Sequence, residues 1–170
     1  MTPLIANDGR RPGTEGVALI LTNPLGQILT LKELGCKPQI GKCAGMRSIP
    51  METIERRESR AEALWRLVHE ELCGLNVELD PAPRGMYWVT PTVAATLYCG
   101  RAPALDLPTQ GCDEDVTEHR WEDPRAAMTQ WLRLGAIDMI RDFLSGIEWI
   151  ERHACEPVAA SLQAHLARAS

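Results

Sequence analysis

The spacing of hydrophobic and polar residues changes along the chain, and the change predicts strands first and helices afterwards. Residues 15–23 form an apolar run, residues 24–27 contain the turn formers Pro and Gly, and residues 28–34 are largely apolar again. Two short apolar runs joined by such a turn are typical of a β-hairpin. Residues 1–14 are polar and carry Pro and Gly, so they predict an N-terminal arm.

Residues 58–75 have the spacing of one amphipathic helix. At 100° per residue, five apolar side chains fall within a sector of about 80° and predict a stripe that faces the core: Ala61, Leu64, Val68, Leu72 and Leu75. Leu67, Glu70 and Glu71 fall in a neighbouring sector, because they are spaced i, i+3 and i+4. Glu71 lies beside the stripe, so we expect its carboxylate to be partly desolvated.

The second half of the chain predicts further strands and then helices. Residues 86–100 and 116–123 have strand patterns, whereas residues 124–146 have helical spacing that begins at Pro124. Gly135 could weaken or interrupt this helix. Residues 147–155 could extend that helix, and a last helix is predicted from Pro157.

This order of elements predicts an α+β fold, an α/β/α sandwich in which helices flank a mixed β-sheet. No repeat or linker divides residues 15–150, so they are expected to form a single domain. Residues 151–170 are expected to be a helical extension of that domain. This extension either covers the sheet or forms a homodimer contact. The sequence does not distinguish between these two alternatives.

Composition and charge exclude few functions. The chain has 170 residues, is 45% hydrophobic and carries a net charge of −5. An acidic protein is disfavoured as a partner of nucleic-acid polymers and of anionic membranes. The longest apolar run, VALIL, is too short to cross a bilayer, and the first residues lack the pattern of a signal peptide. We therefore expect a cytoplasmic protein. An acidic protein can still bind a phosphate-bearing small molecule, provided that a metal ion or a local basic group neutralises the phosphate.

The cysteines predict free thiols. Six are present at irregular spacing, and no C-x-x-C motif occurs. A chain of this length folds without covalent staples, so a disulfide framework is not expected.

Two adjacent carboxylates on the predicted helix are the candidate chemistry. Glu70 and Glu71 are hard oxygen ligands of the kind that binds Mg²⁺ or Mn²⁺ together with substrate phosphates. The competing interpretation is a solvated helix face, on which Arg66 pairs with Glu70 four residues later. The helix by itself leaves both interpretations open.

The spacing of the charged residues over positions 58–71 favours the metal site over the solvated helix face. Glu58, Arg66, Val68, Glu70 and Glu71 follow the pattern E-x7-R-x-V-x-E-E. This pattern resembles the signature of the Nudix superfamily of MutT-like hydrolases, G-x5-E-x7-R-E-U-x-E-E-x-G-U, in which U is aliphatic. The resemblance extends over residues 15–145, because the preceding hairpin and the later strand and helix fall where such domains have comparable elements.

Four positions depart from that signature. Glu52 stands where the first glycine belongs, and Leu67 replaces the glutamate that follows the arginine. Cys73 takes the place of the second glycine, and Gly74 fills the final aliphatic slot, so the Gly-aliphatic pair is displaced by one residue. Leu67 is the gravest departure, because leucine offers no oxygen to a metal ion and cannot act as a general base.

The resemblance implies a pyrophosphohydrolase that uses Mg²⁺ or Mn²⁺ to cleave a nucleoside diphosphate-linked compound. It implies that Glu70 and Glu71 hold the metal, that Arg66 orients a motif carboxylate, and that Glu58 ties the preceding loop to the helix. The alternative is a catalytically inactive protein of the same fold that binds a nucleotide-like or phosphorylated ligand. Leu67 and Glu52 favour this alternative, whereas the retained pattern favours the hydrolase.

Other acids are candidates to replace the carboxylate missing at position 67. Glu52 and Glu55 lie in the loop before the helix, and a later acidic stretch offers Asp113, Glu114, Asp115 and Glu118. Nudix domains commonly draw a further carboxylate from such a later segment, so the resemblance adds Glu114 and Glu118 to the candidates. For each acid, an ordinary solvated charge is the competing interpretation.

Overall fold

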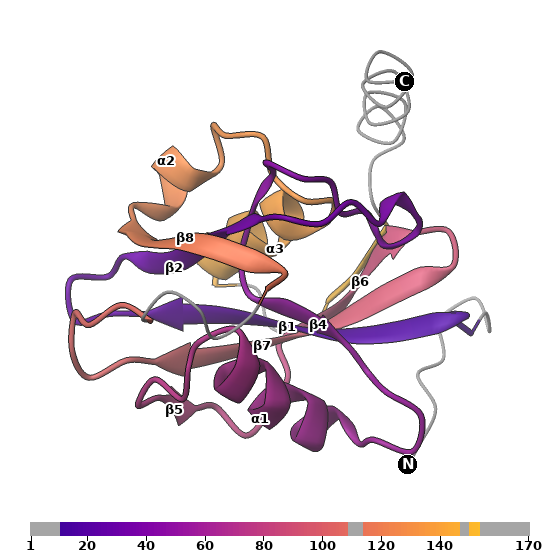
Figure 1. Ribbon diagram of the computed structural model, residues 1–170, viewed down its shortest axis with the longest axis horizontal. Helices are drawn as coiled ribbons and strands as arrows, with labels where there is room; N and C mark the ends of the chain where they lie inside the picture. Colours follow the sequence, from indigo (N-terminus) through magenta and orange to yellow (C-terminus); the bar gives the residue numbers. More distant parts are fainter. Residues whose placement is uncertain (1–10, 109–113, 147–149, 154–170) are drawn as a thin grey trace.

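A nine-stranded mixed β-sheet is the centre of the fold in the computed structural model, which describes residues 11–108, 114–146 and 150–153 (Figure 1). The strands are β1 (Thr14–Thr22), β2 (Ile28–Glu33), β3 (Arg47–Ser48), β4 (Met51–Thr53), β5 (Glu78–Leu79), β6 (Gly85–Thr90), β7 (Val93–Arg101), β8 (Val116–Glu122) and β9 (Ile150–His153). The main path runs β3-β2-β1-β7-β6-β9, while β4 pairs with β1, β5 with β7 and β8 with β2.

Strand β1 organises this sheet. It runs parallel to β7 from the Thr14–Val93 pair to the Thr22–Arg101 pair, and it is antiparallel to β2 and β4. Its central residues, 17–21, are fully buried, as expected for a strand with both faces covered. Gly16 allows β4 to approach closely, because a Cβ there would lie 2.8 Å from the carbonyl oxygen of Glu52.

Helices cover both faces of the sheet, which confirms the predicted α/β/α sandwich (Figure 1). One apolar cluster joins β1 to helix α1 (Arg60–Glu70), and another joins the opposite face to helix α3 (Ala136–Leu144). A short helix α2 (Pro124–Ala127) and a 3-10 turn η1 (Pro38–Ile40) complete the described helical segments. None of the described helices is both long and apolar enough to span a membrane.

Helix α1 begins with a capping box. The Ser59 hydroxyl accepts a hydrogen bond from the backbone N–H of Glu62 at 3.2 Å, and the Glu62 carboxylate accepts one from the N–H of Ser59 at 2.8 Å. Beyond the helix, Gly74 has a φ of 65° and donates its N–H to the carbonyl of Val68 at 3.1 Å. Gly74 therefore ends the helix region in the left-handed conformation that glycine favours.

The buried stripe of α1 differs from the predicted one. Its buried members are Ala63, Leu64, Leu67 and Val68, and Leu72 continues the stripe past the helix end. Leu67 is completely inaccessible and packs in one cluster with Val17 and Leu19, whereas Ala61 is exposed. The prediction is confirmed for Leu64, Val68 and Leu72 and wrong for Ala61. The buried face is turned toward Ala63 and Leu67, whose spacing fits the helical period equally well.

Three other predicted elements also differ from the structure. Residues 86–100 form the hairpin β6–β7 rather than one strand, with a turn that contains Pro91. The predicted helix 124–146 is divided into α2 and α3, because Gly135 adopts a φ of 83° at the start of α3. Residues 150–153 pair with β6 as a parallel strand instead of extending a helix. The arm over residues 1–10 and the helix from Pro157 lie outside the described residues.

The thiol prediction is confirmed at three described cysteines. Cys36, Cys43 and Cys99 are free, whereas Cys73 is disulfide-bonded and the prediction is wrong there.

The burial of Leu67 gives a stability prediction. Leu67→Glu should lower the free energy of unfolding by about 3–5 kcal/mol, because it places a carboxylate without a partner in an apolar cluster. Leu67→Met is the volume-matched control and should cost less than about 1.5 kcal/mol. Urea denaturation of the three proteins measures both values. A Leu67→Glu protein as stable as the methionine variant would contradict this placement of the side chain.

Candidate functional site

The guanidinium of Arg66 joins helix α1 to the loop that precedes it. Its Nε and Nη2 donate to the two carboxylate oxygens of Glu58 at 2.9 and 3.1 Å. Nη2 also donates to the carbonyl of Thr53 at 2.7 Å. The pairing with Glu58 is bidentate, the strongest form of an arginine–carboxylate contact. Arg66 thus fixes the end of β4 and the loop against the helix.

Arg66 faces a surplus of negative charge. Its Nη1 lies 3.2 Å from a carboxylate oxygen of Glu70, 3.6 Å from one of Glu52 and 4.0 Å from one of Glu55. The side chain of Glu55 is 71% exposed and that of Glu70 is 46% exposed, whereas that of Glu52 is 23% exposed. Of these three acids, Glu52 is therefore the one that is partly withdrawn from solvent.

These contacts set two pKa values. The hydrogen bonds from Arg66 hold the pKa of Glu58 below its usual range, in spite of the opposing effect of burial. The same hydrogen bonds, in which the Glu58 carboxylate accepts, raise the pKa of Arg66. Both partners are therefore charged at neutral pH.

Glu71 is held in place at the end of α1. Only 4% of the residue is exposed, and its Oε2 accepts a hydrogen bond from the backbone N–H of Met51 at 3.2 Å. Its carbonyl oxygen accepts a hydrogen bond of 2.8 Å from Nε2 of His119. The predicted desolvation of Glu71 is thus confirmed, and its carboxylate is anchored to β4.

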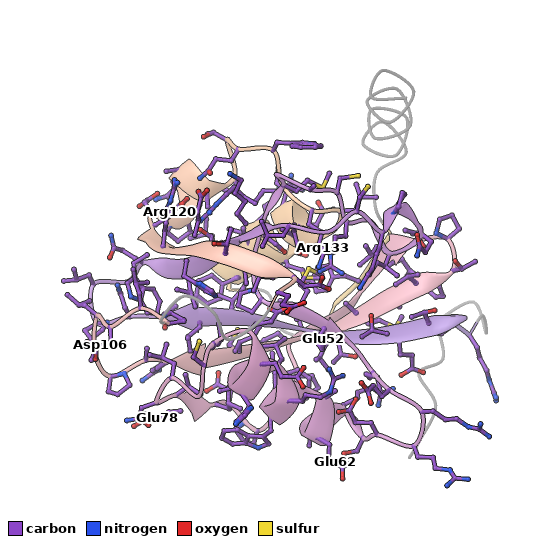
Figure 2. All side chains as sticks on the ribbon, viewed as in Figure 1. Glu52, Glu62, Glu78, Asp106, Arg120 and Arg133 are labelled. Carbon is purple, nitrogen blue, oxygen red and sulfur yellow. The ribbon has the colours of Figure 1, made fainter. Side chains whose placement is uncertain are left out.

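Glu71 lies in a polar groove. The groove is lined by Lys37, Ile40, Lys42, Met51, Glu52, Thr53, Glu71, Asp115 and Arg133. Its three carboxylates come from β4, from the end of α1 and, in Asp115, from the residue before β8. The cations come from the loop after β2 and from the segment before α3. In Figure 2 the labelled Glu52 and Arg133 lie near the centre of the molecule, whereas Glu62 and Glu78 lie at its α1 edge. The groove therefore combines negative and positive groups from distant parts of the sequence.

The cations of the groove are paired with one buried acid, Glu33, and one half-exposed acid, Asp115. Glu33 is 1% exposed, and its carboxylate lies 2.9 Å from Nζ of Lys42 and 3.0 Å from Nη1 of Arg133. Asp115 lies 3.1 Å from Nζ of Lys37 and 3.4 Å from that of Lys42. Burial acts to lower the pKa of Lys42, but Glu33 and Asp115 outweigh it and the pKa is raised. Lys42 is therefore charged while it lines the groove.

Glu52 occupies the position at which the signature has a glycine. It belongs to β4, pairs with Val17 of β1 and is absent from the described residues with positive φ. Its Oε1 accepts a hydrogen bond from the N–H of Thr53 at 2.7 Å. Burial raises the pKa of Glu52, against the effects of that hydrogen bond and of Arg66. The backbone at the position of the signature glycine is thus extended, and the carboxylate of Glu52 lines the groove.

The other predicted acids lie elsewhere. Glu114 is exposed and does not line the groove. Glu118 pairs with Lys32 at 2.8 Å and with Arg120 at 3.0 Å, and the contact with Lys32 lowers its pKa. Asp115, from the same acidic stretch, is the one of these three that reaches the groove. Asp113 lies outside the described residues.

Three groove residues have no counterpart among the sequence-based candidates. Lys37 and Lys42 lie in a segment that reads only as a loop, and Arg133 lies in a stretch that reads as helix core. One signal was present: Glu33 is an acid at the end of a largely apolar strand, and an acid that is buried at such a position needs a cationic partner. The identity of that partner depends on the tertiary fold.

The described residues do not form a complete protein cage for a metal ion. No three His, Cys, Asp or Glu side chains within the described ranges are grouped so that they could hold one. Mg²⁺, however, is often bound by one or two carboxylates together with water and substrate phosphates. Glu52 and Glu71 line one groove and fit that simpler arrangement, whereas Glu70 pairs with Arg66 and does not line the groove.

The Glu58–Arg66 pair gives a pH prediction. The pKa of Glu58 is lower in the folded protein than the value of about 4.3 expected for an unfolded chain, so the pair stabilises the fold above that pH. Glu58→Gln should lower the free energy of unfolding by about 2 kcal/mol at pH 7. The difference from the wild type should shrink as pH falls through the folded pKa.

Urea denaturation between pH 7 and pH 3 measures this dependence. Glu78→Gln, at an exposed site on β5, where Glu78 pairs with Arg101 of β7, is the matched control and should change stability little at any pH. A Glu58→Gln deficit that stays constant down to pH 3 would contradict the assignment.

Comparison with known proteins supports the fold. No protein-family model matches the sequence, and no curated protein matches it significantly. Among solved structures, a NUDIX hydrolase from Nitrosomonas europaea superposes with a TM-score of 0.64 at 21% identity, covering 82% of this chain and 93% of that chain.

Two further structures are similar to this chain over most of their length. An ADP-ribose pyrophosphatase from Streptococcus suis 89-1591 has a TM-score of 0.58 at 16% identity, covering 82% of this chain and 98% of that chain. An Ap4A hydrolase from C. elegans has a TM-score of 0.62 at 12% identity, covering 77% and 96%. At these identities the comparison concerns the fold, and it agrees with the glutamate–arginine pattern around α1. The chain has the Nudix fold of the MutT-like hydrolases.

Proposed function

We propose that this chain is a divergent Nudix-type pyrophosphohydrolase that cleaves the diphosphate linkage of a nucleoside diphosphate-linked compound. The observation that carries the proposal is the groove, in which Glu52 and Glu71 lie together with Lys37, Lys42 and Arg133. The ADP-ribose pyrophosphatase and the Ap4A hydrolase of the same fold support a substrate of this class.

The two signs of charge in the groove suit such a substrate. A diphosphate is a dense anion, and arginine and lysine are the side chains that bind phosphate oxygens most strongly. The chain as a whole has a net charge of −5, so the local cations must supply this attraction. Lys42 and Arg133 are held by the buried Glu33, which gives them fixed positions for a phosphate.

Mg²⁺ or Mn²⁺ is the proposed cofactor, held by Glu71 and Glu52 together with the substrate phosphates. When bound, such an ion polarises phosphoryl oxygens and activates a water molecule. Glu71 is suited to this role by its anchorage to the N–H of Met51. Arg66 and Glu58 have a positioning role, because their pairing holds the loop that carries Glu55 and the end of β4.

Binding without turnover is the second candidate function. The specific observation in its favour is Leu67. A leucine stands where the signature places a glutamate, four residues before Glu71, and its side chain is completely buried in the core. On this hypothesis the groove still takes a nucleotide-like or phosphorylated ligand, but hydrolysis is negligible.

Substitutions of the two groove carboxylates test the hydrolase. Glu71→Gln and Glu52→Gln should each lower product release by at least roughly 10- to 100-fold, because each removes a metal-binding charge. The assay uses ADP-ribose, nucleoside diphosphate sugars and dinucleoside polyphosphates, with Mg²⁺ and with Mn²⁺. Glu78→Gln is the control and should behave as the wild type. Turnover that is indifferent to both groove substitutions would contradict the proposed site, and a wild type that binds these compounds without turnover would favour the second candidate.

Lys37 tests the cationic side of the groove. Its side chain is half-exposed, so Lys37→Gln should leave the fold intact and raise KM by about three- to tenfold through the loss of one phosphate contact. Lys32→Gln is the matched control, because Lys32 pairs with Glu118 outside the groove. The test is to measure KM of the wild type and both variants for one compound from the panel. Equal KM values for the two variants would remove Lys37 from the binding site.

A further inference from the structure

Two thiols lie in contact at the base of the loop that carries the groove lysines. The Sγ atoms of Cys36 and Cys43 are 3.3 Å apart. Cys36 is exposed and Cys43 is buried, and both are free. A disulfide has an S–S distance of about 2.05 Å, so the two sulfurs need to approach by little more than about 1 Å to form one.

The backbone between the thiols already has the geometry of a strand pair. Lys37 and Lys42 form an antiparallel bridge in which each donates its N–H to the carbonyl of the other, at 2.9 and 3.3 Å. Cys36 and Cys43 are the next pair outward, at a position that is not hydrogen-bonded. The Cα atoms of such pairs are about 4.5 Å apart, which lies within the range that disulfides span.

The loop between the thiols is held against the core. Gly41 adopts a φ of 71°, and a Cβ there would lie 2.7 Å from Leu134 and 2.8 Å from Val89. Lys42 is fixed by Glu33, and Lys37 by Asp115. A disulfide between Cys36 and Cys43 would therefore join two positions that are already held close together.

We propose that Cys36 and Cys43 form a thiol–disulfide modification site, which a low-molecular-weight disulfide converts into an intramolecular disulfide at the base of the Lys37–Lys42 loop. The exposed Cys36 thiolate attacks one sulfur of the reagent, forms a mixed disulfide and releases one thiolate. Cys43 then loses its proton to solvent and attacks Sγ of Cys36, which releases the second thiolate. The two protein thiols are oxidised, and one reagent disulfide is reduced to two thiols.

The order of attack follows from exposure. A reagent in solution reaches Cys36, whereas Cys43 lies behind it with its sulfur directed at that of Cys36. Burial raises the pKa of Cys43 to about 11, which keeps it a thiol at neutral pH until it acts as the resolving group.

Peptide mapping of the full chain tests the site. Trypsin does not cleave before Pro38 but does cleave after Lys42, so it places Cys36 in the peptide 33–42 and Cys43 in the peptide 43–47. After incubation of the folded protein with oxidised glutathione, the unreduced digest should contain these two peptides linked to each other. Treatment with a thiol should release them.

Three variants give matched controls. Cys43→Ser should stop at the glutathione adduct of Cys36, Cys36→Ser should give no linked peptides, and Cys99→Ser should react as the wild type. The oxidised wild type should also melt roughly 5 °C above the same protein before oxidation, in which the disulfide of Cys73 is equally intact, because the new link closes a loop in the unfolded chain. Cys36 found linked to a cysteine other than Cys43, or no linkage in a protein that remains folded, would overturn the proposal.

Discussion

The buried carboxylate of Glu33 is the constraint on which the groove depends. One of its oxygens lies 2.9 Å from Lys42 and the other lies 3.0 Å from Arg133. A buried charge is tolerated only when it is paired and hydrogen-bonded, and removing one partner leaves another charge without compensation. These contacts therefore tie β2, the loop after it and the segment before α3 to one point. Both cations are kept at the groove as a consequence.

The negative side of the groove is built in a different way from the signature it resembles. Leu67 belongs to the apolar core, so the helix contributes Glu71 without a carboxylate one turn earlier. Glu52 brings a carboxylate from β4 instead, where the signature has glycine. The Arg66–Glu58 pair, with its contact to Thr53, holds β4 and the helix in the relation that places both carboxylates in one groove. Relative to the signature, one departure thus removes a carboxylate and the other adds one.

The sequence predicts the fold well, because its strongest signals are local. The hairpin pattern of residues 15–34 and the helical spacing of residues 58–75 place β1, β2 and α1 close to their observed positions. The division of residues 86–100 was missed, since the turn at Pro91 is a local event inside a long apolar pattern. Gly135 was expected as a point at which the helix 124–146 could be interrupted, and it stands at the start of α3 with a left-handed φ. The burial of Leu67 was missed because two overlapping apolar faces of the same helix, one with Ala61 and one with Leu67, both have helical spacing. Lys37, Lys42 and Arg133 were missed because their roles arise from pairing with residues distant in sequence.

Hydrolysis in oxygen-18-labelled water tests the central claim most directly. The folded chain would be incubated with ADP-ribose and Mg²⁺ in labelled water, and the products analysed by mass spectrometry. If the groove hydrolyses a diphosphate linkage, the compound should divide into two monophosphates, one of which carries a single labelled oxygen. Intact compound that remains bound to the chain, with no label in any phosphate, would contradict the hydrolase and identify a binding protein of the same fold.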